Sequence, residues 1–160
     1  NAAYQKICSF ENIKFSDIEN SLNVNFKTPY FLITSLINDL IKSKARVINI
    51  GTIHNKLTLP NFFCYSSSKL AMSSITKSLS VELGDKIEFI EISPGAIMTS
   101  MLQKGFSSSS DLEKKKISIP SKKFIDPYEL SESIYKVSQL PGNINGLYVS
   151  LDGGVGNLLT

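Results

Sequence analysis

Apolar and polar positions follow one another along the chain in blocks that predict helices and strands in turn. Residues 16–43 carry apolar side chains near helical spacing and predict one long helix. Ser16 and Glu19 form a capping-box pattern, which predicts the start of that helix. Pro29 lies inside the segment, where its missing backbone N–H removes one hydrogen bond and favours a bend.

Two short apolar runs, residues 46–51 and 87–92, predict buried strands, because strands covered on both faces carry continuous apolar runs. Residues 61–83 between them predict a second long helix, and Gly84 is expected to close it as the first residue beyond its end. A last strand is predicted at residues 147–151.

The segment 96–125 is long for a loop and is expected to form a substrate lid, with a short helix at residues 111–117. Asp126 followed by Pro127 is a strong helix start and predicts a helix over residues 126–140. Strands that alternate with helices predict a single domain of the α/β class, with a doubly wound parallel sheet.

Polar residues follow the predicted strands. Thr52 comes after the first strand, Ser93 follows the second, and Tyr65 and Lys69 lie near the start of the helix between them. Ligands of open parallel sheets bind beyond the carboxyl ends of the strands. These residues are therefore expected to converge on one edge of the sheet.

The spacing of Tyr65 and Lys69 has a chemical meaning. On a helix, residues four apart lie on one face, so the ammonium is expected to stabilise the phenolate and lower its pKa. A tyrosine tuned in this way acts as a general acid or base. The pair alone is a weak motif, and a core tyrosine beside a solvated lysine is the alternative.

Several loosely specific motifs in the right order give the chain a resemblance to the short-chain dehydrogenase/reductase family. The thirteen-residue separation of Thr52 from Tyr65 resembles the compact branch of that family. The matching residues, in chain order, are Asn1, Asn25, Thr52, Tyr65, Lys69, Pro94, Gly95, Thr99 and Asp152.

The resemblance implies an oxidoreductase that transfers a hydride between NAD or NADP and a small carbonyl or alcohol substrate. It implies that Tyr65 is the general acid/base and that Lys69 lowers the pKa of Tyr65 and binds the nicotinamide ribose. Thr52 would hydrogen-bond the substrate oxygen, and Asn25 would hold a water in the proton path to Lys69. Simpler alternatives stay open: Thr52 could only cap its loop, and Asn25 could be a buried polar group bonded to the backbone.

The resemblance also implies a set of cofactor contacts and an oligomer. Backbone groups of Ile97 and the side chain of Thr99 would bind the carboxamide, although Thr99 could simply cap a lid helix. A homodimer or homotetramer is implied through the two long predicted helices. The implied cofactor-binding residues are Asn1, Tyr65, Lys69, Pro94, Gly95, Ile97 and Thr99.

One motif of the family is absent from this sequence. The family opens with a strand and a glycine-rich turn, Thr-Gly-x-x-x-Gly-x-Gly, which the chain lacks. Residues 1–160 therefore resemble the C-terminal part of a Rossmann-type, NAD(P)-binding domain without its N-terminal strands. A second hypothesis follows, in which the chain is a non-enzymatic remnant or scaffold that binds no cofactor.

Composition and charge bear on the expected partners, location and metal content of the protein. The net charge of +3 is modest, and no aromatic residues interleave the lysines at 114–116 and 122–123, so no nucleic-acid partner is expected. No apolar run is long enough to span a membrane. Cys8 and Cys64 show no Cys-x-x-Cys spacing, which favours a reducing, cytoplasmic location. His54 is the only histidine, and no metal site is predicted.

Overall fold

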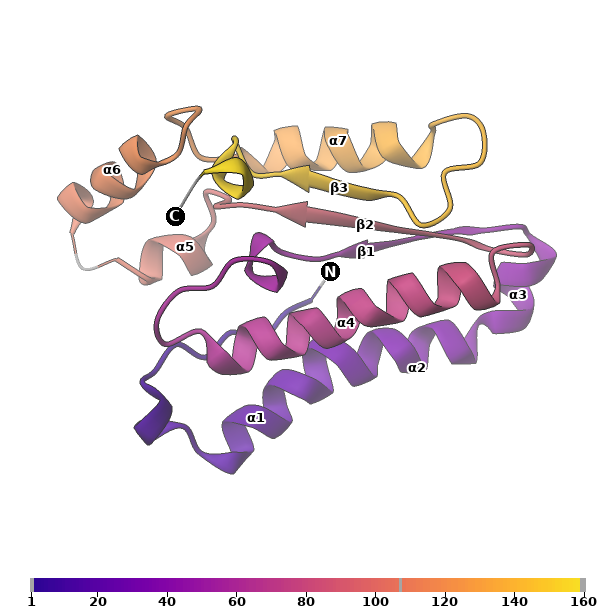
Figure 1. The fold of residues 1–160 in the computed structure, drawn as a ribbon, viewed down its shortest axis with the longest axis horizontal. Coiled ribbons are helices and arrows are strands. Elements are labelled where there is room, and N and C mark those ends of the chain that lie inside the picture. The colour runs from indigo at the N-terminus through magenta and orange to yellow at the C-terminus, as the bar shows by residue number, and fades with distance from the viewer. Residues whose placement is uncertain (1, 107, 159–160) are drawn as a thin grey trace.

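Three parallel strands form the centre of the molecule (Figure 1). The structure is a computed structural model and describes residues 2–106 and 108–158. Strands β1 (Arg46–Ile50), β2 (Glu88–Pro94) and β3 (Tyr148–Leu151) lie in the order β1-β2-β3. The prediction of an α/β fold with a parallel sheet is confirmed, and each strand lies within two residues of its predicted bounds.

Helices cover both faces of this sheet (Figure 1). Helix α4 (Phe63–Glu82) packs on one face, and α1 (Phe15–Leu22) and α2 (Thr28–Ser35) pack against α4. Helix α3 (Ile37–Lys42) continues from α2 toward β1. The opposite face is covered by α7 (Pro127–Ser138).

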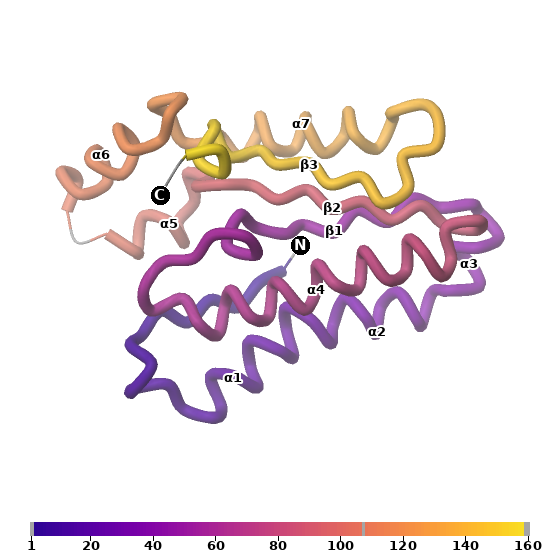
Figure 2. The backbone as a smooth tube through the Cα atoms, in the orientation of Figure 1, coloured from indigo at the N-terminus to yellow at the C-terminus, as the bar shows by residue number. Residues whose placement is uncertain are grey.

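The segment 96–125, which was predicted to be a substrate lid, contains two short helices, α5 (Ser100–Lys104) and α6 (Ser109–Ser118), where a single helix over 111–117 was predicted. Ser108 caps α6 by accepting a hydrogen bond from the backbone N–H of Asp111 at 3.1 Å. Figure 2 shows the N-terminal segment running toward α1 at the same end of the molecule as α5 and α6.

The first predicted helix begins one residue earlier than expected. Phe15 is the first helical residue and Lys14 occupies the cap position, so Ser16 is not the cap. The carboxylate of Asp17 reaches back and accepts a hydrogen bond from the Lys14 backbone N–H at 3.1 Å. Asp17 therefore has the role expected of Glu19, because the acidic residue that lies three positions after the cap is the one that can reach it.

The prediction of one continuous helix over residues 16–43 is wrong. Between α1 and α2 the segment Asn23–Lys27 is π-helical, just before Pro29, and a second break falls at Leu36. Pro29 cannot donate to the preceding turn, and a π turn is one way a helix accommodates the lost bond. The wider turn contains Asn25, which is only 1% exposed.

Strand β2 divides the core into two layers, because alternate side chains point to opposite faces of the sheet. Ile87 and Phe89 pack toward α4 with Ile33 and Ile75 from the helices. On the opposite face, Ile90 and Ile92 pack with Leu130 of α7. The α4-side row continues along β2 as Glu91 and Ser93, so this face changes from apolar to polar toward the carboxyl end of the strand.

The predicted ends of α4 and the start of α7 have identifiable causes. Gly84 follows α4 as expected, but its φ is not positive; a Cβ there would collide with the Ser80 carbonyl and the Asn145 side chain. Asp126 caps α7 as predicted, accepting a hydrogen bond from the backbone N–H of Tyr128 at 2.8 Å.

Within residues 2–106 and 108–158, no helix is long and apolar enough to cross a membrane.

Candidate active site

Thr52, Tyr65 and Lys69 come together at the carboxyl end of β1. Tyr65 and Lys69 lie on the first two turns of α4, on the face toward the sheet, and are 9% and 5% exposed. Thr52 lies two residues beyond the end of β1, is buried, and its hydroxyl is hydrogen-bonded to the Tyr65 hydroxyl. The Lys69 Nζ donates to the Ile50 carbonyl at 2.8 Å. The structure thus brings together three residues that lie apart in sequence.

The pKa of Tyr65 differs from the predicted direction. Burial raises the pKa above its usual value of 10.0, and the hydrogen bond with Thr52 only partly opposes this. The predicted lowering is wrong for this structure, because the causes that act on Tyr65 are burial and Thr52, and burial has the larger effect. Burial also lowers the pKa of Lys69 to about 8, against an opposing effect of the Glu91 charge. Lys69 therefore still carries most of its charge near neutral pH.

Asn25 is buried next to Ser68 of α4, and both polar atoms of its side chain make hydrogen bonds. The amide donates to the Tyr4 carbonyl at 2.8 Å and to Ser68 Oγ at 2.9 Å, and its oxygen accepts from the Tyr4 N–H at 2.8 Å. Ser68 is fully buried beside Lys69 on α4. The side chain therefore fastens the N-terminal segment to α4, and the role of Asn25 in proton transfer stays a prediction.

The turn after Thr52 provides an aromatic wall beside Tyr65. Thr52 caps this 3₁₀ turn, Ile53–Asn55, by accepting from the His54 N–H at 3.3 Å. The His54 ring stacks on Phe62 with centroids 4.6 Å apart and meets the Tyr65 ring at 6.2 Å. Burial lowers the pKa of His54, and the charge of Lys115 on α6 lowers it further. His54 is therefore neutral at physiological pH and forms part of an uncharged surface.

The predicted cofactor contacts begin at Pro94, the last residue of β2, and continue along the chain that follows, where the Gly95 N–H bonds to the Leu151 carbonyl at 2.8 Å. A Cβ at Gly95 would lie 3.0 Å from the Asp152 Cα, so glycine is needed by this close approach. The Thr99 hydroxyl accepts from the Leu102 N–H at 3.3 Å and caps α5, which is the simpler of its two predicted roles. Ile97 bridges to Ile125 across the lid. Asn1 lies outside the described residues.

Asp152 has a structural role, as its position in Asp152-Gly153-Gly154 suggested. Although burial acts to raise its pKa, hydrogen bonds from the Ser150 hydroxyl and the N–H groups of Gly154 and Gly156 hold it below the usual value. These bonds fix the bend after β3.

The sequence reasoning missed a buried polar cluster around Glu91. Its carboxylate accepts hydrogen bonds from Asn55 Nδ2 at 2.7 Å, Ser93 Oγ at 2.8 Å and Ser73 Oγ. A signal was present, because Glu91 interrupts an otherwise apolar strand, and a buried charged residue needs partners.

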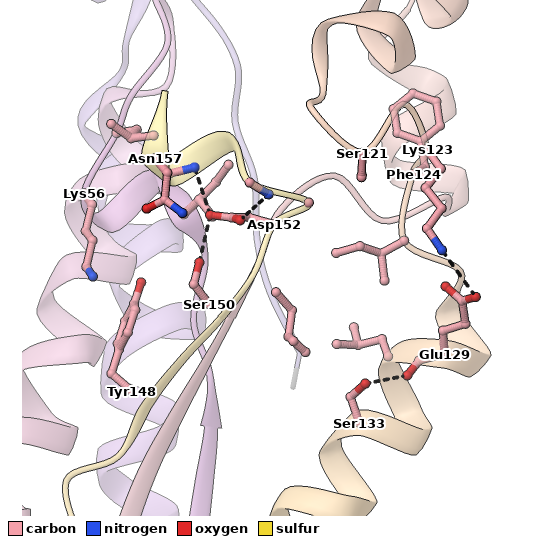
Figure 3. A pocket seen from close by; sticks show the side chains of 18 residues that line it. Lys56, Ser121, Lys123, Phe124, Glu129, Ser133, Tyr148, Ser150, Asp152 and Asn157 are labelled. Carbon is pink, nitrogen blue, oxygen red and sulfur yellow. Dashed lines mark hydrogen bonds and ion pairs between the residues drawn. The ribbon is translucent and has the colours of Figure 1, made fainter. Parts of the chain in front are cut away.

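A cavity of about 490 Å³ lies next to this cluster but does not include Tyr65 (Figure 3). Tyr148 forms part of its wall, and its hydroxyl donates to Asn55 Oδ1 at 3.3 Å. The Lys56 ammonium lies 3.9 Å from the centre of the Tyr148 ring. Figure 3 shows Ser150 and Asp152 on one side of the cavity, and Ser133 and Glu129 of α7 on the other.

Ligands of open parallel sheets bind beyond the carboxyl ends of the strands, which is where Thr52, Tyr65 and Lys69 lie. A family model described as short chain dehydrogenase matches residues 1–109. The chain belongs to the short-chain dehydrogenase family.

Two curated relatives show the extent of the likeness. The chain is 31% identical over 147 residues to the 3-oxoacyl-[acyl-carrier-protein] reductase FabG of Buchnera aphidicola subsp. Baizongia pistaciae, covering 90% of this chain and 59% of that protein. It is 28% identical over 161 residues to carbonyl reductase [NADPH] 2 of Sus scrofa, covering 96% and 65%. The chain thus spans less than two thirds of either relative.

Solved structures agree on the fold. The structure of ElxO with NADP bound superposes with a TM-score of 0.87 at 26% identity, covering 99% of this chain and 66% of that one. Levodione reductase superposes with a TM-score of 0.88 at 18% identity, covering 99% and 65%. The Rossmann-type fold expected from the sequence is therefore confirmed.

Proposed function

We propose that this chain forms the catalytic portion of an NAD(P)-dependent oxidoreductase that acts on a small carbonyl/alcohol pair. The observation that carries the proposal is the convergence of Thr52, Tyr65 and Lys69 at the carboxyl end of β1. Family membership supports the same reaction class.

Tyr65 is the proton donor to the carbonyl oxygen in reduction and the acceptor from the alcohol in oxidation. Its pKa is raised by burial, so the hydroxyl is protonated at neutral pH and has a proton to donate. The Thr52 hydroxyl, which is hydrogen-bonded to Tyr65 in this structure, would donate its single proton to the substrate oxygen when substrate is bound. Lys69 supplies positive charge beside the forming phenolate, and Asn25 fastens α4 behind it.

The donor groups present fit a nicotinamide dinucleotide. The Lys69 ammonium and the Tyr65 hydroxyl are the kinds of donor that bind ribose hydroxyls, and Pro94, Gly95, Ile97 and Thr99 border the same edge of the sheet. The nicotinamide supplies the hydride when it is bound. NADPH is named for the carbonyl reductase and NADP for the ElxO structure, and we extend the choice of NAD or NADP to this chain.

Replacing Tyr65 by phenylalanine tests the function. The protein is assayed with the N-terminal segment that its relatives carry, by following oxidation of the reduced nicotinamide with a panel of small carbonyl compounds. Tyr65→Phe is expected to lower kcat by at least about 100-fold, the usual contribution of a general acid. Tyr135→Phe, which changes an exposed tyrosine on α7, is the matched control. Equal turnover of Tyr65→Phe and wild type would overturn the mechanism, and inactive wild type would favour the scaffold hypothesis.

We also propose a homodimer or homotetramer that uses α2 and α4 as an interface, and a cytoplasmic location. The two helices expose large apolar side chains, which a second subunit would cover. These side chains are Tyr30, Phe31 and Leu32 on α2, and Leu70 and Val81 on α4. Cys8 and Cys64 are free thiols, which fits a reducing compartment. Phe31→Glu is expected to give a monomer by light scattering; a dimer that persists would count against this interface.

A further inference from the structure

Glu91 is a buried acidic side chain in the centre of the sheet. It is 2% exposed and lies on β2 between Ile90 and Ile92, with its side chain on the α4 face. An isolated carboxylate at such a depth is strongly destabilising unless hydrogen bonds or charges compensate it. The partners of Glu91 therefore show what holds it there.

Three different elements donate hydrogen bonds to this carboxylate. Asn55 donates from the 3₁₀ turn at 2.7 Å, Ser73 donates from α4, and Ser93 donates from β2 itself at 2.8 Å. The two carboxylate oxygens thus accept three hydrogen bonds, which compensate for the loss of solvent. Asn55 is held in turn by the Tyr148 hydroxyl on β3.

These contacts lead to Thr52 and to α4, the helix that carries Tyr65 and Lys69. The Asn55 backbone N–H bonds to the Thr52 carbonyl at 3.2 Å, so the Glu91–Asn55 bond fixes the turn that Thr52 caps. Ser73 lies four residues after Lys69 on α4, on the same buried face of the helix. A Cβ at Gly51 would collide with Glu91 Oε1, so glycine at the end of β1 leaves room for the carboxylate.

We propose that Glu91 is a positioning residue of the active site, which fixes Thr52 against α4 and places a negative charge behind the Lys69 ammonium. The proposal rests on the proposed function for its catalytic consequence. It goes beyond the Thr52, Tyr65 and Lys69 set, because Glu91 contacts none of the reacting atoms and acts through Asn55 and Ser73.

The charge of Glu91 matters because its surroundings are poorly screened. Its charge acts on Lys69 of α4, and the Tyr148 hydroxyl of β3 reaches it through Asn55. Burial lowers the pKa of Lys69 to about 8, and the negative charge of Glu91 opposes that effect. Without this charge, Lys69 is expected to lose its proton closer to neutral pH.

Glu91→Gln tests the charge. The titration of the Lys69 side chain is followed by NMR of the protein labelled in lysine. The pH profile of kcat/KM is measured in the same protein joined to the additional N-terminal strands that its relatives carry. The Lys69 midpoint is expected to fall by about one pH unit, and the alkaline limb of the profile is expected to fall with it. Glu88→Gln is the matched control, since Glu88 lies on the same strand but pairs with Arg46 at the other end.

The outcomes distinguish a failure of the proposal for Glu91 from a failure of the proposed oxidoreductase function. An unmoved Lys69 titration in folded Glu91→Gln overturns the charge role, and so does an equal shift in Glu88→Gln. The titration needs no turnover, so a shift of Lys69 in an inactive protein supports the role of Glu91 while the proposed reaction fails.

Asn55→Ala tests the positioning role and does not require Glu91→Gln to fold. It removes the link from Glu91 to the turn but keeps the carboxylate. It is expected to lower kcat by about tenfold or more, with little change in the Lys69 midpoint, because displacement of a positioned donor slows the chemical step. Full kcat in Asn55→Ala overturns the positioning role.

Discussion

Replacing Lys69 by methionine is expected to stabilise the folded protein while abolishing its proposed activity. Lys69 is 5% exposed, and burial lowers its pKa from 10.5 to about 8. At about 1.4 kcal/mol for each pH unit, the charged form is destabilised by about 3 kcal/mol in the folded state. Methionine leaves the Ile50 carbonyl without its donor, at a cost of about 1–2 kcal/mol. The net gain at pH 7 is therefore about 1–2 kcal/mol.

The sign of the pH dependence makes this prediction specific. The folded-state pKa lies below the unfolded one, so the unfolded chain keeps a proton that the folded chain releases between about pH 8 and 10.5. Wild-type stability therefore gains a rising contribution across that window, and the penalty is fully present below it. The advantage of Lys69→Met is expected to be largest near pH 7 and to shrink by pH 10.

The measurement is urea unfolding followed by circular dichroism at several pH values from 7 to 10. Lys77→Met is the matched control, because Lys77 lies on the same helix with its side chain exposed. It should not change the pH dependence. The reasoning is refuted if Lys69→Met is less stable than wild type at pH 7, or if the difference between them stays constant across the window.

Three further substitutions have outcomes that follow from the contacts described. Phe89→Ala removes a fully buried ring from the α4-side core and is expected to cost about 3–5 kcal/mol in chemical denaturation; a cost below 1 kcal/mol would mean that the site collapses. Asn25→Ala leaves groups of Tyr4 and Ser68 without partners and is expected to cost about 2–3 kcal/mol, with faster amide exchange at Tyr4. Asp126→Ala removes the α7 cap and is expected to cost about 1 kcal/mol, visible as a lower Tm.

The fold was predictable because local signals and periodicity agree with it. Continuous apolar runs marked β1 and β2, and Asp126 with Pro127 marked the start of α7. The start of α1 was predicted wrongly because neighbouring residues suit the same role. Asp17 and Glu19 both suit a capping box, and only the position of Lys14 in space decides between them.

The sequence predicted only those residues of the candidate site that belong to a known motif. The spacing of Thr52, Tyr65 and Lys69 predicted that they meet, and the structure brings them together. The direction of the Tyr65 pKa was not predictable, because it depends on how deeply the ring is buried. The Glu91 partners come from three separate elements, and no local spacing links them.

The two faces of β2 divide the sheet into parts that differ in their tolerance of sequence change. On the α7 side, Ile90, Ile92 and Leu130 interact by apolar packing, which accepts exchanges that preserve volume. On the α4 side, Glu91 and Ser93 depend on directional bonds that a small displacement breaks. Substitutions that arise in evolution, or that are introduced to stabilise the protein, are therefore best tolerated in the core beneath α7. Repacking there leaves the hydrogen bonds of Glu91 and Ser93 unchanged.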